Sequence, residues 1–194
     1  MRRYALRGFT LVELLIGAAM LALAIVALLG AFIGQSALNE HARNLTWAIN
    51  DANRVMERLR EQNTGAACAQ PDARAPGFTS WDAWLADTTA AGGGGKSVQP
   101  NPAVNERIVV TCRDNTTLAY CGTTDQISAN EWRTQGIDTN FDPIQIAVAV
   151  CWRHRGRTIG ECTWNAGALT ANDADADGVV ESPAMLSTVM TCRR

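Results

Sequence analysis

The chain has 194 residues, with 17 basic and 19 acidic side chains, and its length suits one globular domain with an additional segment. A formal net charge of −2 argues against a general nucleic-acid-binding protein, which needs an excess of positive charge. The distribution of apolar residues along the chain is more informative than these totals.

An apolar stretch near the N-terminus covers residues 9–33 and is interrupted by a single charge, Glu13. As a helix rising about 1.5 Å per residue it would be roughly 37 Å long, which exceeds the bilayer core of about 30 Å. A secretory signal peptide has a shorter apolar core that ends at a small-residue cleavage site, whereas the small residue here, Gly8, precedes the run. The sequence therefore predicts a transmembrane segment that cleavage at Gly8 would leave attached.

The basic residues Arg2, Arg3 and Arg7 precede this span, and no acidic residue accompanies them. Positive charge on one side of a span marks the cytoplasmic side. We therefore expect a single-pass protein in a lipid bilayer, with the N-terminus in the cytoplasm and everything after Gly34 outside the inner membrane.

Glu13 places a carboxylate four residues inside the apolar segment, where it is costly without a partner. Cleavage after Gly8 would create a cationic partner, the amine of Phe9. The alternative is that Glu13 extends to the nearby lipid head groups. We prefer pairing with the Phe9 amine of a neighbouring subunit, which would align the helices in a staggered bundle.

Residues 8–13 read glycine, phenylalanine, threonine, leucine, valine and glutamate at the head of the apolar span. This motif resembles that of the type IV pilins and pseudopilins, and the likeness covers about the first 35 residues. It implies that a prepilin peptidase cuts after Gly8 and methylates the new amine of Phe9, and that Glu13 guides subunits into a filament. The implied partners are other pilin subunits and an inner-membrane assembly platform, with a periplasmic domain that becomes extracellular in the assembled filament.

A stripe of apolar residues at three- and four-residue spacing follows the span. Its members are Leu38, Ala42, Leu45, Ile49, Ala52, Met56 and Leu59. Charged residues, Asp51 among them, fall off this stripe, and no proline interrupts it. The pattern predicts one helix over residues 9–62, whose second half packs on a globular domain. A coiled coil also fits the spacing, but the many alanines favour packing on a sheet.

The remaining residues, 63–194, carry strand signals at 107–112, 144–152, 158–159 and 185–191. Ser80 is placed to cap a short helix over residues 81–86. The fold class expected is α+β: a long N-terminal helix packed on an antiparallel sheet of about four strands and stabilised by disulfides. The chain divides into a leader (1–8), a transmembrane half-helix (9–33), an amphipathic half-helix (34–62) and a globular domain (63–194). The pilin family has this shape.

All six cysteines lie after the span: Cys68, Cys112, Cys121, Cys151, Cys162 and Cys192. An even number in an exported domain favours disulfides over a metal site, because no Cys-x2-Cys pair is present. Local spacing suggests the pairs Cys151–Cys162, about a hairpin centred on residues 156–157, and Cys112–Cys121. Cys68 and Cys192 would then form the third pair.

Asp173, Asp175 and Asp177 alternate in one loop, and Glu181 follows them. The spacing resembles the first half of a calcium-binding EF-hand loop, but Ala184 stands where a bidentate glutamate is expected. Calcium is a possible cofactor, and a solvated acidic loop is the alternative.

Residues 152–157 are basic and aromatic, so they are able to contact DNA phosphates and stack a base, or to form a solvated hairpin tip. We find no convincing catalytic group and expect no enzyme. The sequence predicts a minor type IV pilin or pseudopilin, a structural subunit that enters or primes a filament. The alternatives are a tip module that binds DNA or a surface, and a minor pseudopilin of type II secretion.

Overall fold

The computed structural model describes residues 10–62, 75, 77–114, 144–174 and 179–190. The chain divides into two compact units, Met1–Ala42 and Arg43–Arg194.

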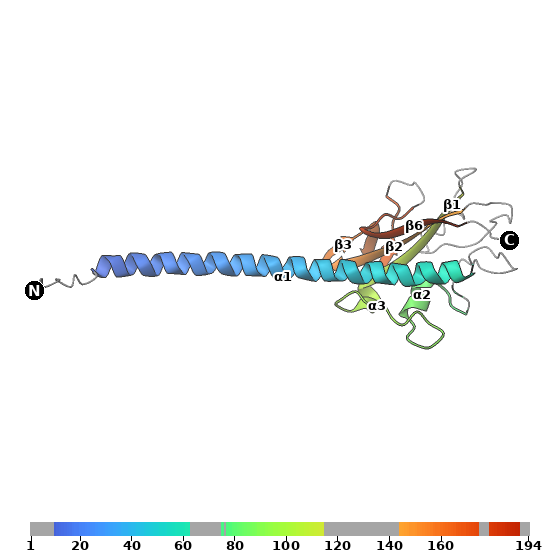
Figure 1. Cartoon of the computed structure of the whole chain (residues 1–194), viewed down its shortest axis with the longest axis horizontal. Coiled ribbons are helices and arrows are strands. Elements are labelled where there is room, and N and C mark those ends of the chain that lie inside the picture. The colour runs from blue at the N-terminus through green and yellow to red at the C-terminus, as the bar shows by residue number, and fades with distance from the viewer. Residues whose placement is uncertain (1–9, 63–74, 76, 115–143, 175–178, 191–194) are drawn as a thin grey trace, which may run out of the picture. The chain divides into compact units, whose positions relative to one another are not determined.

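Helix α1 spans Leu11–Gln62 and contributes to both units (Figure 1). The predicted long helix is confirmed, although Phe9 lies outside the described residues. The part of α1 in the first unit exposes its apolar side chains, such as Leu11, Met20 and Leu28. By length and composition, α1 is suited to crossing a membrane.

In the second unit α1 buries one face. The apolar residues of that face are Ala48, Ala52, Val55, Met56 and Leu59. Leu45 and Ile49 of the predicted stripe are only partly buried. The expectation that Asp51 lies off the packed face is wrong, because its side chain is fully buried. Hydrogen bonds from Ser97 and Arg54 replace the water that this carboxylate gives up.

The main sheet is built around strand β2 (Ile144–His154). Strand β1 (Glu106–Asp114) pairs antiparallel with one edge of β2 over residues 144–152. Strands β6 (Ala184–Met190) and β3 (Arg157–Ile159) pair antiparallel with the other edge, at residues 144–150 and 152–154 respectively. The four predicted strands are therefore confirmed, with ends that differ by one or two residues.

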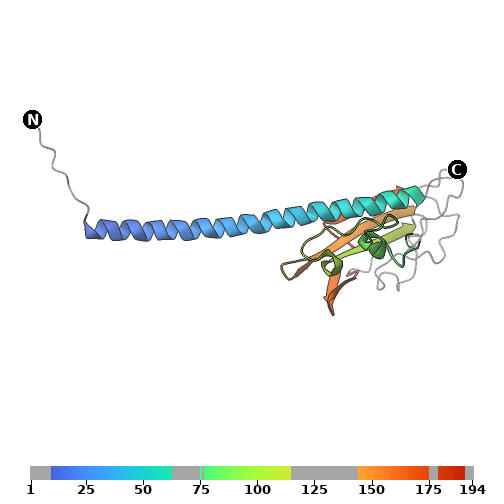
Figure 2. The ribbon, with the colours of Figure 1, turned by 90° about the horizontal axis from the view of Figure 1, so that it is seen from below.

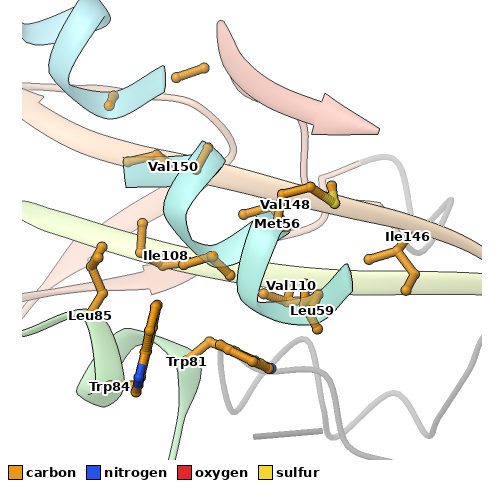
Figure 3. Close-up of a cluster of buried hydrophobic side chains, with 14 of the residues drawn as sticks. Met56, Leu59, Trp81, Trp84, Leu85, Ile108, Val110, Ile146, Val148 and Val150 are labelled. Carbon is orange, nitrogen blue, oxygen red and sulfur yellow. The ribbon is translucent and has the colours of Figure 1, made fainter. Parts of the chain in front are cut away.

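Residues of β2 alternate between two buried surfaces. Ile146, Val148 and Val150 lie in the cluster that includes α1, whereas Ala149 and Cys151 lie in a second cluster on the other side of the sheet. Figure 2 shows the last turns of α1, in teal, along the strands of this sheet. The residues that meet between them are Met56 and Leu59 of α1, Ile108 and Val110 of β1, and Ile146, Val148 and Val150 of β2 (Figure 3).

Helix α2 (Trp81–Ala86) extends this core with Trp81, Trp84 and Leu85. Its predicted cap is confirmed, because the Ser80 hydroxyl oxygen accepts a hydrogen bond of 2.7 Å from the amide of Ala83. The four-residue helix α3 (Pro102–Asn105), just before β1, has no counterpart in the sequence prediction.

The second cluster is covered by a two-stranded sheet that the sequence did not predict, β4 (Cys162–Asn165) and β5 (Ala168–Ala171). Its turn places Ala166 and Gly167 at φ values of 47° and 91°, the left-handed conformation of a tight hairpin turn. Leu169 and Ala171 are buried in this cluster.

The predicted disulfide between Cys151 and Cys162 is present. The expected hairpin centre is wrong by one residue, because His154 pairs with Arg157 and the turn is formed by Arg155 and Gly156. Cys162 begins β4, so the bond links the two sheets instead of closing one hairpin. Cys112 belongs to β1, whereas Cys68, Cys121 and Cys192 lie outside the described residues.

Candidate functional site

The first turn of α1 holds Glu13 in a reciprocal set of hydrogen bonds with Thr10. The Thr10 amide donates to Glu13 Oε2 at 2.9 Å, and the Thr10 hydroxyl donates to the same oxygen at 3.0 Å. In return the Glu13 amide donates to Thr10 Oγ1 at 3.3 Å. This is a capping box, in which a residue before the helix and the third helical residue satisfy each other's amides.

The capping box gives Glu13 a partner within its own chain. Threonine followed three residues later by glutamate, just before an apolar run, is the sequence signature of this cap. The sequence analysis considered only the Phe9 amine and the lipid head groups as partners, so it missed Thr10. The hydrogen bonds offset part of the cost of placing a carboxylate beside apolar residues, but they supply no opposite charge.

The surroundings of Glu13 on the helix are apolar. Leu11, Val12, Leu14 and Ile16 are each more than half exposed, and an added Cβ at Gly17 would meet no atom within 4 Å. The sequence contains no lysine or arginine between Arg7 and Arg43. Residues 8–42 therefore supply no lysine or arginine side chain to pair with Glu13. Gly8 and Phe9, the predicted processing site, lie outside the described residues.

Glu161 is hydrogen-bonded twice to Glu181, at one end of the acidic loop. Its amide donates to the carbonyl oxygen of Glu181 at 2.7 Å, and the Glu181 amide donates to Glu161 Oε2 at 2.8 Å. Asp173 is half-buried and Glu181 is exposed, whereas Asp175 and Asp177 lie outside the described residues. Among the described residues, no three potential metal ligands converge.

The basic hairpin joins β2 to β3. The guanidinium of Arg153 lies 4.2 Å from the centre of the Trp164 ring, a cation–π contact between the two sheets. The Nδ1 atom of His154 is 3.5 Å from Nδ2 of Asn44, a buried residue of α1. Trp164 thus already uses one ring face within the chain, which leaves less of it for stacking a base.

A groove of about 620 Å³ runs beside the last turns of α1. Its lining includes Arg54, Glu57, Arg58, Glu61 and Trp84. The guanidinium of Arg58 lies 2.7 Å from Glu61, and Glu57 forms an ion pair of 2.6 Å with Arg60. The groove therefore carries paired charges of both signs.

Comparison of the chain with protein-family models, with curated proteins and with solved structures gives no match.

Proposed function

We propose that this protein is a minor type IV pilin or pseudopilin, a structural subunit that enters or primes a filament. The observation that carries the proposal is Glu13, a carboxylate at the start of a long apolar helix, which has a neutral hydrogen-bond partner but no lysine or arginine between it and Arg43. The motif at residues 8–13 is the second support. Prepilin peptidase, other pilin subunits and an inner-membrane assembly platform would be the partners.

The role proposed for each residue follows from its chemistry. Cleavage after Gly8 would leave the amine of Phe9 four residues before Glu13, so subunits that lie side by side would bring an amine to a carboxylate. Opposite charges attract strongly where water is scarce. The apolar side chains of α1 in the first unit would be covered by lipid before assembly and by neighbouring helices after it.

Three variants separate the charge of Glu13 from its capping function. Glu13→Gln removes the charge but keeps a residue suited to the capping box, Glu13→Leu removes both, and Thr10→Ala removes the cap but keeps the charge. We expect all three to be cut after residue 8, as read from the intact mass of membrane-extracted protein. Both Glu13 variants should be depleted from sheared filaments at equal membrane levels, and Thr10→Ala should be depleted less.

Gly8→Val is the control for processing, since it should leave the leader attached. If Glu13→Gln entered filaments normally, incorporation would depend on the capping box and not on the charge of Glu13. Equal incorporation of every variant, or an uncut wild-type chain, would refute the proposed function.

A further inference from the structure

Two acidic side chains, Asp51 of α1 and Glu106 at the start of β1, are buried as neighbours inside the second unit. Asp51 is fully buried and Glu106 is 2% exposed. The Asp51 carboxylate, as a hydrogen-bond acceptor and through its charge, raises the pKa of Glu106. Two adjacent ionised carboxylates in such a site would repel each other and lose their hydration. We call Asp51 and Glu106 the carboxyl pair.

The hydrogen-bond donors around the pair are unevenly distributed. Asp51 accepts from the amide of Ser97 at 2.8 Å, from the Ser97 hydroxyl at 2.9 Å and from the guanidinium of Arg54. Glu106 Oε2 accepts from the amide of Val98 at 3.0 Å. The other oxygen, Oε1, is buried, and no donor reaches it from the described residues. An oxygen in this position suits the hydroxyl of a carboxylic acid, which itself donates.

Four charged residues bind the carboxyl pair or its neighbours: Arg54 of α1, Asp82 of α2, Lys96 of the loop between α2 and α3, and Arg107, which follows Glu106 in β1. Lys96 Nζ lies 2.7 Å from Asp82 Oδ1, and the Arg107 guanidinium lies 3.0 Å from Asp82 Oδ2. Helix α3 contributes no charged residue, and the residue opposite Glu106 on β2 is Trp152. Since Arg54 binds Asp51, the cations are directed to the two aspartates.

Burial is the first cause that raises the pKa of Glu106, from 4.5 to about 9, and the hydrogen bond and charge of Asp51 act in the same direction. The amide of Val98 and the charge of Lys96 oppose this shift but do not outweigh it. Lys96 donates instead to the backbone oxygen of Glu106, at 2.8 Å.

Residues 96–99 are hydrogen-bonded both to α1 and to the start of β1. Ser97 is bound by Asp51, Val98 by Glu106, and Gln99 by Asn44, whose Nδ2 donates to the Gln99 carbonyl at 2.8 Å. Val98 is fully buried in the main core. We propose that Glu106 keeps its proton at neutral pH and donates it to Asp51, and that this shared proton holds residues 96–99 against α1. Loss of the proton would place two negative charges side by side and release the segment in alkali.

The sign of the pH effect follows from proton binding. Between pH 4.5 and 9 the unfolded chain has released the Glu106 proton and the folded chain still holds it. The stability of the folded chain therefore falls as pH rises through this window. The folding equilibrium constant decreases by up to tenfold per pH unit, and the decrease ends above the pKa of Glu106 in the folded chain.

The test compares the wild-type chain with Glu106→Gln in detergent micelles, by urea unfolding followed through tryptophan fluorescence from pH 5 to pH 9. Glutamine is neutral and can donate to Asp51, so the variant should lose the fall in stability that Glu106 causes. Glu57→Gln, the same substitution at an exposed ion pair of α1, is the matched control and should keep that fall. Equal pH dependence in all three chains would overturn the proposal.

A measurement on the wild-type chain covers the case in which Glu106→Gln fails to fold. Infrared spectra of the chain with 13C-labelled glutamate should show a protonated carboxyl at pH 7 that disappears around pH 9. Amide exchange of residues 97 and 98 should accelerate over the same range, relative to amides of β2. Absence of a protonated glutamate at pH 7 would overturn the proposal.

Discussion

Helix α1 contains two regions whose leucine side chains have opposite surroundings. Leu28, in the first unit, is 69% exposed, whereas Leu59, in the second, is fully buried. Both residues belong to the same 52-residue helix. A leucine on a helix therefore contributes to folding only where another part of the chain covers it, and the described residues leave the leucines of the first region exposed.

The polar residues of α1 show the same contrast. Glu13 is exposed and is bound by Thr10, three residues away. Asp51 is buried and is bound by Ser97, 46 residues away in the sequence. The first carboxylate is satisfied as soon as the helix forms, while the second is satisfied only when the domain folds.

The largest expected effect comes from truncating the same residue type in each region. Leu59→Ala should lower the free energy of unfolding by about 4 kcal/mol, because it removes buried apolar surface and leaves a cavity. Leu28→Ala should change it by less than about 0.5 kcal/mol. Urea unfolding of the full chain in detergent micelles measures both, and equal losses would contradict the contrast between the regions.

The next largest effect concerns a buried ion pair in the second unit. Asp82 binds Lys96, Arg107 and the amide of Ile108. Asp82→Asn should cost about 3 kcal/mol, because it leaves the Lys96 ammonium, 4% exposed, without its ion pair. Arg60→Gln, which breaks an exposed pair with Glu57, is the control. Exposed pairs contribute little, so a similar loss in both variants would show that burial is not the deciding factor.

Removing the link between the two sheets should have a somewhat smaller effect. Replacing Cys151 and Cys162 together by alanine opens a short loop, and we expect a loss between about 2 and 3 kcal/mol. Unfolding of the double variant, compared with wild type with and without reductant, measures this loss. A double variant as stable as the oxidised wild type would show that packing alone holds the sheets together.

The smallest expected effect concerns the cap of α2. Ser80→Ala removes the acceptor for the Ala83 amide and should cost about 1 kcal/mol, whereas Ser80→Asp should preserve the cap. Thermal unfolding of the two variants tests this expectation. An equal loss in both would mean that position 80 acts through something other than capping.

Local patterns in the sequence were sufficient for much of this fold. The absence of proline and the apolar spacing predicted α1, the serine cap predicted α2, and alternating residues predicted strand β2. The Thr10–Glu13 cap was equally local and was readable from its spacing. These features depend on neighbours within a few residues, so the sequence contains them directly.

Tertiary structure alone decided the rest. Strands β4 and β5 have four residues each, too few for a period to be recognised, and the disulfide and the second cluster hold them in place. The burial of Asp51 and Glu106 depends on donors in the loop before β1, which meet these carboxylates only in the folded domain. Sequence spacing determines which residues share a face, but whether a polar residue on that face is buried depends on distant partners that replace its water.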